Sequence, residues 1–431
     1  MKSVSRLALG ATLAIGATSA LFTAPADAQR APRGKAQQNQ AGAQAQAQGP
    51  ALNLNAQERA ALLALQTAAA GTDRAAQDAA IAAARPVATG GDARYAFSGL
   101  LFRIGRQRTD SALLLESLPG LVDSPRTSAA DLPGYLRVQY ELARNAGQRD
   151  VADRALARLA QLEPNNPETQ VALAQSRVTQ GRVAEGLRAI QAAIQTRQAA
   201  GQPAPEAWHR FGVATAYNSQ DAAVRALAPA FARGLVTAYP TAVNWRDALT
   251  VVREGSTFDA AAQLDLYRLM LATGALSGER DYFDFANALN SGGYPAEAKA
   301  VLDQGISRGA IDRAKPAFSQ LLSTASGRIA ADRADLTSSQ RSALAAATGT
   351  PALRTGDAFF GYGRYPEAIA LYQAALQKGG VDANVVNTRL GIAHALAGQR
   401  PQAEAALRAV TGPRSEIAAY WLIWLQQRPA A

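Results

Sequence analysis

The chain repeats a six-residue sequence at a fixed distance near its C-terminus. Gly363-Arg-Tyr-Pro-Glu-Ala368 returns 35 residues later as Gly398-Gln-Arg-Pro-Gln-Ala403, and Gly356 and Gly391 keep the same separation. Apolar residues at helical spacing surround both copies. A period of this length is typical of α-solenoids, in which one helix pair cannot bury its own apolar face and stacks on its neighbours. We therefore predict an all-α fold, a right-handed α-solenoid of antiparallel helix pairs forming a superhelix.

Length and composition favour the same architecture. A chain of 431 residues is too long for one compact core, so it forms either two or three domains or an array that grows without a central core. Aromatic residues make up only 6% of the chain, and long stretches of Ala, Leu, Gln, Arg and Glu favour helix. No convincing run of alternating β-branched residues is present. We expect the array.

The N-terminus has the three parts of a secretory signal peptide. Lys2 and Arg6 form a basic start, an apolar stretch runs over Leu7–Phe22, and an Ala-x-Ala site ends at Ala28. We predict that residues 1–28 are removed after Ala28 and that the protein is periplasmic in a Gram-negative bacterium. The alternative is a segment retained as an anchor, although it is short and only mildly apolar for a membrane span.

Charge and cysteine content limit the classes of function. The chain has no cysteine, which excludes disulfides, thiol catalysis and cysteine-ligated metals. Its formal net charge is +10, or +9 without Lys2, Arg6 and Asp27. The arginines are spread along the chain among acidic residues, whereas nucleic-acid-binding proteins concentrate basic residues on one face. We expect no nucleic-acid partner, and a surface that favours anionic partners such as peptidoglycan or acidic polysaccharide.

Composition changes divide the chain into segments. Residues 29–51 are rich in Gln and Ala and resemble a disordered tether. A capping box of Asn55 and Glu58 begins the first helix. We expect degenerate helical hairpins over 52–130, repeats over 131–348, two clearer repeats over 349–417 and a capping helix over 418–431. Within these, 52–130, 225–278 and 315–348 are out of register and are either degenerate repeats or plain helical hairpins.

The repeated residues resemble those of the tetratricopeptide repeat family. That family places small residues where two helices meet, a glycine at the turn, and aromatic residues between successive pairs; Ala368 and Ala403 fit the first role, and Tyr365 and Tyr372 the last. His394 stands where an aromatic residue is usual. The matching positions are Gly356, Phe359, Gly363, Tyr365, Ala368 and Tyr372 in one copy and Gly391, Gly398, Ala403 and Leu407 in the next. Earlier turns with Gly147 and Gly181 fit the same pattern.

The resemblance implies a concave groove lined by the first helix of each repeat. Polar residues of such helices usually hold a peptide's carboxylate or backbone amides. Asn287 and Asn290 are three residues apart and share a helix face, and an asparagine side chain can satisfy both N–H and C=O groups. The alternative is that these residues are solvated helix surface. The candidate groove residues are Arg137, Glu141, Arg144, Asn145, Gln175, His209, Tyr217, Arg280, Asn287 and Asn290.

Catalytic motifs are scarce. Gly305-Ile-Ser307-Arg-Gly309 matches the nucleophile elbow of serine hydrolases, but that chemistry needs a strand-to-helix turn and a histidine base. We expect Ser307 to end a helix instead. The only histidines are His209 and His394, and His394 is expected to be packed. We therefore expect no catalytic, metal-binding or cofactor-binding residues.

The sequence is most consistent with a non-enzymatic periplasmic scaffold that binds protein or peptide segments in the cell envelope. One alternative is a component of envelope polysaccharide assembly or export. Another is a cell-wall-acting solenoid enzyme, which would need two carboxylates in one cleft. At the C-terminus, Trp421 and Trp424 are expected on a helix buried on one side only, with docking to a membrane or partner as the alternative.

Overall fold

The computed structural model describes residues 51–428, which form 21 α-helices and one 3-10 helix, with no strand among these residues. This confirms the all-α fold of helix pairs. The predicted signal peptide and nearly all of the predicted tether lie outside the described residues. Within the described range, no helix combines the length and the apolar composition that crossing a membrane requires. The chain divides into two compact units, 51–176 and 177–428.

The first unit is built from consecutive helix pairs. The pairs are α1 with α2, α3 with α4, and α5 with α6. Asn55 accepts a hydrogen bond from the Glu58 backbone while the Glu58 side chain accepts one from Asn55, so the predicted capping box begins the first helix. The helices are α1 (Ala56–Ala70), α2 (Arg74–Ala84), α3 (Gly91–Arg108), α4 (Ser111–Val122), α5 (Leu132–Asn145), α6 (Arg149–Leu162) and α7 (Pro167–Thr179), within which the division falls.

The second unit contains the remaining helices. They are α8 (Val183–Ala199), α9 (Glu206–Tyr217), α10 (Ala222–Arg225), α11 (Ala228–Ala238), α12 (Ala242–Gly255), α13 (Ala260–Thr273), α14 (Gly278–Gly292), α15 (Pro295–Ser307), α16 (Pro316–Ala345), α17 (Gly349–Gly361), α18 (Tyr365–Lys378), α19 (Ala383–Leu396), α20 (Arg400–Arg408), the 3-10 helix η1 (Gly412–Arg414) and α21 (Ser415–Gln426). Among them, α9 packs on α11, α14 on α15, α17 on α18, and α19 on α20.

The glycines of the repeated sequence have two distinct roles. Gly363 and Gly398 have φ angles of 70° and 76°, a left-handed conformation that ends one helix and begins the next, as the sequence predicts. Gly356 and Gly391 lie inside helices, where a Cβ atom would stand 2.8 Å from the Tyr372 ring and 2.6 Å from the Leu407 side chain. Glycine at these positions therefore lets the two helices of a pair approach closely.

The other repeated residues pack between the helices. Ala368 and Ala403 are fully buried, and so is Tyr372. Tyr365 is only partly buried, and its ring meets that of Phe360 edge to face with centroids 5.4 Å apart. The repeat positions thus behave as the resemblance implies.

Residues 315–348 form neither a degenerate repeat nor a helical hairpin. They contribute α16, a single helix of 30 residues. The segment has no proline after Pro316, and Gly327 remains helical with open space around it. Its Ala, Leu, Ser, Gln and Arg residues favour an uninterrupted helix, because nothing in the middle requires a turn.

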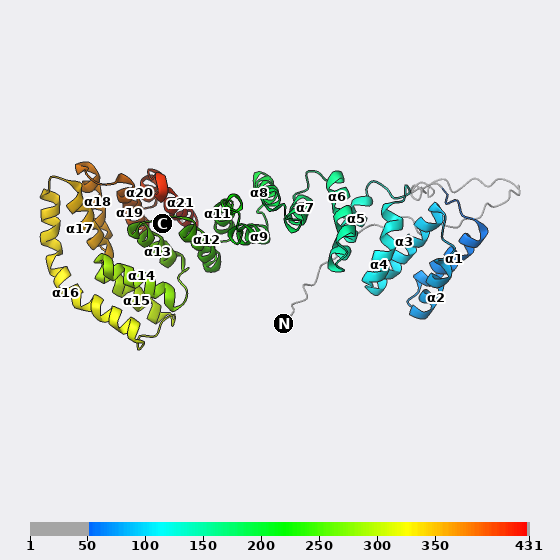
Figure 1. Cartoon of the computed structure of the whole chain (residues 1–431), viewed down its shortest axis with the longest axis horizontal. Helices are drawn as coiled ribbons and strands as arrows, with labels where there is room; N and C mark the ends of the chain where they lie inside the picture. Colours follow the sequence, from blue (N-terminus) through cyan, green and yellow to red (C-terminus); the bar gives the residue numbers. More distant parts are fainter. Residues whose placement is uncertain (1–50, 429–431) are drawn as a thin grey trace, which may run out of the picture. The chain divides into compact units, whose positions relative to one another are not determined.

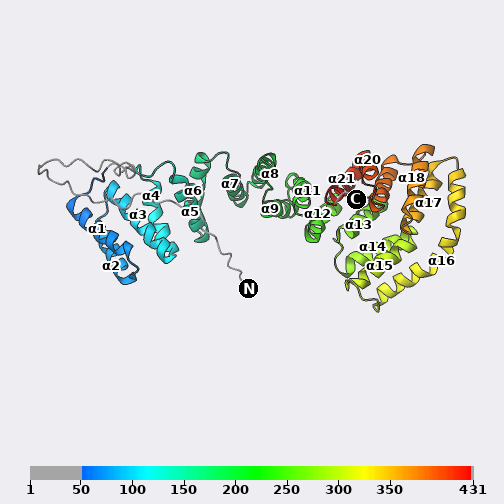
Figure 2. The same cartoon turned by 180° about the vertical axis from the view of Figure 1, so that it is seen from behind.

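The C-terminal helix does not cap an open array. It packs on α11 and α13 as well as on α19 and α20, so the helices from α11 to α21 form a closed ring, seen from both sides in Figures 1 and 2. Trp421 is fully buried and Trp424 is 7% exposed. The six buried residues of α21, which include both tryptophans, lie on one face of the helix, as expected for burial on one side. That face packs inside the ring, so neither tryptophan is available for docking to a membrane or partner.

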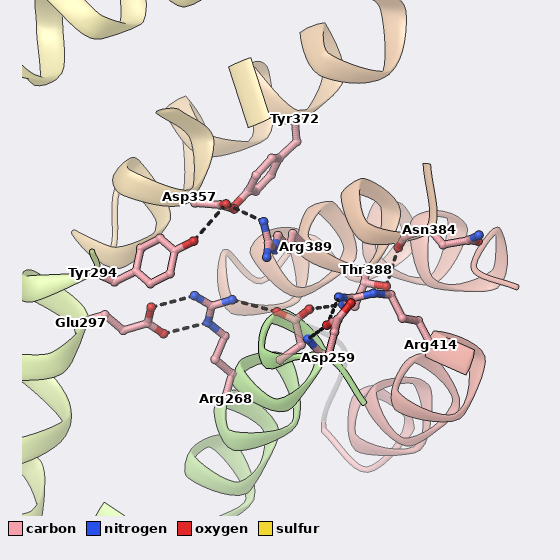
Figure 3. A network of polar contacts seen from close by, with 12 residues as sticks. Asp259, Arg268, Tyr294, Glu297, Asp357, Tyr372, Asn384, Thr388, Arg389 and Arg414 are labelled. Carbon is pink, nitrogen blue, oxygen red and sulfur yellow. Dashed lines mark hydrogen bonds and ion pairs between the residues drawn. The ribbon is translucent and has the colours of Figure 1, made fainter. Parts of the chain in front are cut away.

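Ion pairs join α13 to the residue that precedes α21, where the ring closes (Figure 3). Arg414 donates hydrogen bonds to Asp265, at 2.7 Å, and to Asp259, at 2.9 Å. Asp265 also accepts from Arg268 at 2.8 Å. Arg268 in turn makes two 2.8 Å hydrogen bonds to the carboxylate of Glu297. One buried carboxylate, that of Asp265, therefore bridges two arginines from distant parts of the sequence.

A second buried carboxylate continues this cluster of ion pairs. Asp357 accepts hydrogen bonds from Arg389, from the Tyr372 hydroxyl at 2.8 Å and from the Tyr294 hydroxyl at 3.3 Å. Burial raises the pKa of Asp357, and the positive charges of Arg389 and Arg268 oppose this shift. Burial and the charge of Asp357 raise the pKa of Tyr294 to about 12. These groups are thus stable inside the protein only while they remain paired.

Candidate binding surface

Two pockets lie on a row of helices in the second unit, α9, α12, α14 and α16, of which α9 and α14 each begin a helix pair. We call the faces that carry the two pockets the first-helix surface. Arg246 on α12 and Asp281 on α14 form an ion pair of 3.5 Å that links two helices of this row. The resemblance implied a binding groove on first helices, and of the helices that line these two pockets, α9 and α14 are the first of a pair.

The amide pocket lies between α14 and α16 and has a volume of about 470 Å³. It holds both predicted asparagines, Asn287 and Asn290, which extend from the same face of α14. Its apolar wall is formed in part by Phe283 and Leu321. The polar residues of the amide pocket are Asn287, Asn290, Ser291, Gln320, Thr324 and Arg328.

The two asparagines differ in what they can contact. Asn290 is buried, and its side-chain nitrogen donates to the backbone oxygen of Leu321 at 3.1 Å, while its side-chain oxygen accepts no hydrogen bond from a described residue. Arg328 donates to the backbone oxygen of Asn290 at 3.2 Å, which ties α16 to the end of α14. Asn287 is exposed. We infer that Asn290 shapes the wall and that Asn287 is free to bind a ligand.

The arginine pocket lies against α9, α11 and α12 and has a volume of about 520 Å³. It contains the predicted residue Tyr217, whose hydroxyl donates to the carboxylate of Glu254. This hydrogen bond, together with partial burial, raises the pKa of Tyr217. The charged and polar residues of the arginine pocket are Arg210, Tyr217, Asn218, Arg246, Asp247, Thr250 and Arg253.

Three arginines and one aspartate give the arginine pocket a positive charge. Arg210 is already engaged by Glu206 at 2.9 Å and by Asp247 at 3.6 Å. Its partner Glu206 consequently has a lowered pKa, caused mainly by the hydrogen bond from Arg210. Arg246 pairs with Asp281 at 3.5 Å, whereas Arg253 forms no ion pair with a described residue, so Arg253 is the best candidate to meet an anionic group and Arg246 the second.

The remaining candidate groove residues do not join these pockets. Arg280 is 92% exposed, pairs with Asp284 at 3.7 Å and does not line the amide pocket. In the first unit, Arg137 is paired with Glu163 at 2.8 Å, Arg144 with Glu141 at 2.6 Å, Asn145 is exposed and Gln175 is partly exposed. Arg137, Arg144, Asn145 and Gln175 thus belong to a different unit from the two pockets.

His209 does not face a groove, contrary to expectation. It is 1% exposed and packs near the Tyr239 ring and against Gly234, whose absent side chain leaves room for the imidazole. Gly212, Val213 and Ala216 follow His209 at helical spacing and are also buried. The histidine therefore lies on the core-facing side of α9.

Burial lowers the pKa of His209, and the backbone of Phe231 opposes this only in part. The unfolded chain binds a proton near its ordinary value of 6.5, so between that value and the lower folded pKa the unfolded state holds more protons. We expect the free energy of unfolding to fall as the pH drops from 7.5 to 5. His209→Phe should make this pH dependence shallower in urea titrations; an unchanged slope would contradict the assignment.

Ser307 has no environment that would activate it. It is the last residue of α15, so a helix and not a strand precedes it, and its hydroxyl donates to the Gln304 backbone oxygen at 2.9 Å. His394 is buried on α19, with its Nδ1 2.6 Å from the Gln399 side chain, so it is packed as expected. Across residues 51–428, no three acidic or histidine side chains gather in a metal-binding arrangement.

Most of the polar residues of each pocket were not predicted from the sequence. Gln320, Thr324 and Arg328 belong to α16, in a segment whose register does not fit the repeat. Arg246, Thr250 and Arg253 belong to α12, which is also out of register. The polar residues of each set are three or four positions apart and therefore share one helix face. This spacing is the feature of the sequence that could have identified them.

Comparisons with known proteins leave the chain without an assigned family. No family model matches it, and no curated protein matches it. Among solved structures, it is similar to that of Naa15/Naa10 bound to HypK-THB, at 14% sequence identity and a TM-score of 0.20, over 84% of this chain and 70% of that chain. A likeness at this TM-score assigns no family, partner or activity, so membership in the tetratricopeptide repeat family stays a prediction.

Proposed function

We propose that this protein is a non-enzymatic scaffold that binds an extended protein segment on the first-helix surface. The observation that carries the proposal is the presence of two polar pockets on successive helices of one row, one lined by amides and the other by arginines. Pockets of this size, with a few convergent polar groups, are typical of binding sites.

The chemistry of the pockets matches the groups of a peptide. Asn287 and Gln320 offer amide N–H and C=O groups, which pair with the backbone of an extended segment. Arg246 and Arg253 offer guanidinium groups, which bind carboxylates through charge-assisted hydrogen bonds. The preferred ligand is therefore an extended segment with an acidic side chain or a terminal carboxylate.

The N-terminal sequence supports a location outside the cytoplasm, so we propose that the bound segments belong to proteins of the cell envelope. The features of residues 1–28 favour export through a cleavable signal peptide. The excess of arginine also favours anionic polysaccharide or peptidoglycan, and this is why polysaccharide assembly or export remains the second candidate function.

Affinity purification from envelope extract tests the proposal. Two double variants, Asn287→Ala with Gln320→Ala and Arg246→Gln with Arg253→Gln, should each retain the partner at least about fivefold less than the unaltered protein, since side chains that contact the ligand cost about 1 kcal/mol or more when removed. Arg280→Ala is the matched control, because Arg280 lies on α14 but outside the amide pocket.

The alternatives give different results. If both double variants capture the same partner as the unaltered protein, the first-helix surface is not the binding site. If only polysaccharide is retained, the second candidate function replaces the first. Fragments released from purified peptidoglycan would instead establish the cell-wall-acting enzyme.

A further inference from the structure

A third cavity lies on a different set of residues from the first-helix surface. It has a volume of about 570 Å³ and is formed by α13, α15, the turn between α17 and α18, and the end of α19. It shares no residue with the amide pocket or the arginine pocket. We call it the ring cleft, because the helices that form it belong to the closed ring.

One face of α15 forms the length of the ring cleft. Glu297, Ala300, Val301, Gln304 and Arg308 line it, at intervals of three or four residues. A helix rises 1.5 Å per residue, so Glu297 and Arg308 are separated by roughly 16 Å along the helix. The cleft is thus elongated, with an ionisable side chain near each end.

The end near Glu297 carries no net charge. Arg268 is 5% exposed and makes two hydrogen bonds to Glu297, and its guanidinium lies 4.5 Å from the centre of the Phe360 ring. The Phe360 ring, which could otherwise attract a cationic ligand, is therefore already occupied by a cation of the protein. Glu297 is likewise neutralised, so this end offers little to a cation.

The end near Arg308 is positively charged. Arg308 is exposed and forms no ion pair with another described residue. The charges of Arg268 and Glu297 cancel, so Arg308 gives the lining of the cleft a net charge of +1. A cation that lines a cavity without a protein partner favours an anionic ligand group.

The lining between the two ends of the ring cleft is largely apolar and leaves room, with Gln304 as a polar side chain on the α15 face. Ala272, Ala296 and Ala300 leave space between α13 and α15, and Leu271 and Leu396 provide larger apolar side chains. Such a surface favours the apolar part of a ligand, which gains free energy by leaving water. The cleft therefore combines an apolar middle with a cation at one end.

We propose that the ring cleft binds a small amphipathic anion, a molecule with an apolar body and one carboxylate. The apolar body lies along α15 over Ala300 and Leu271, and the carboxylate meets Arg308. The proposal for the ring cleft is independent of the proposal that the first-helix surface binds a peptide segment. An experiment can therefore contradict one of the two proposals and leave the other standing.

Calorimetric titration of the full chain with decanoate tests the proposal, with decanol and decyltrimethylammonium as uncharged and cationic counterparts. Decanoate should bind saturably and more tightly than either. Arg308→Gln should weaken decanoate binding at least about tenfold and leave decanol unchanged, since a charge-assisted hydrogen bond is lost. Ala300→Trp should abolish the binding of both, because it fills the cleft from an exposed position.

Two matched controls should bind decanoate as the unaltered protein does. Arg280→Gln removes an exposed arginine outside the cleft, and Ala370→Trp adds the same bulk at an exposed position of α18 that does not line it. Retained binding in Ala300→Trp would overturn the location, and equal affinity for decanoate and decyltrimethylammonium would overturn the charge preference. The absence of saturable decanoate binding would overturn the proposal as a whole.

Discussion

Arg414→Ala is expected to destabilise the second unit by about 3–5 kcal/mol, the usual cost of removing one partner from a buried ion pair. Asp265 is fully buried between Arg414 and Arg268. Without Arg414, it keeps only one of its two arginines. Because Arg414 directly precedes α21, its loss should also loosen the contact of α21 with α13.

Urea titration measures the loss of stability, and hydrogen exchange of α13 and α21 measures the loosening. Arg408→Ala is the control, because Arg408 forms a solvent-exposed pair with Glu404 that should contribute less than about 1 kcal/mol. If Arg414→Ala and Arg408→Ala lower the free energy of unfolding equally, the buried ion pairs do not hold the ring closed.

Trp421→Ala is expected to cost about 3–5 kcal/mol, as for other large aromatic residues removed from a core. Trp421 is fully buried, and its ring meets that of Trp424 edge to face with centroids 5.2 Å apart. On the same helix, Tyr420 contacts Trp245 of α12 in a similar arrangement, at 6.0 Å. Removing Trp421 should therefore leave a cavity where α21 closes the ring.

Thermal and urea unfolding check this prediction. Leu344→Ala provides the control, because Leu344 is 46% exposed and should change stability by less than about 0.5 kcal/mol. A Trp421→Ala variant that keeps full stability yet loses a partner would instead favour the docking role that the burial of this residue argues against.

Turns and helix pairs could be predicted from the sequence, because they depend on residues that are close together in the chain. Gly363 and Gly398 mark turns because a left-handed backbone conformation favours glycine at that position itself. Gly356 and Gly391 sit at helix contacts within single pairs, whose members are joined by short turns. Helix pairing could therefore be predicted from the period of the repeat.

Ring closure could not be predicted in this way. Asp265 and Arg414 are separated by 149 residues, and no periodicity relates them. Their contact depends on the accumulated geometry of every helix between them. The long helix α16 adds to this difficulty, since it departs from the repeat that would otherwise fix that geometry.

Only part of the candidate site could be predicted, because only part of it lies in segments that follow the repeat. Asn287 and Asn290 lie on one helix face in a segment with clear repeat register, and the structure places both in the amide pocket. Their neighbours Gln320 and Thr324 come from α16, where the register is lost. His209 was misplaced because it was judged as a single polar residue, whereas Gly212, Val213 and Ala216 show that its face of α9 is buried.

Photo-cross-linking from the first-helix surface tests the central functional claim most directly. A photoreactive amino acid is placed at Asn287, inside the amide pocket, or at Arg280, on the same helix but outside it. The partner recovered from envelope extract is expected to cross-link from position 287 and not from position 280. Cross-linking from position 280 alone, or from neither position while the partner is still captured, would contradict this claim.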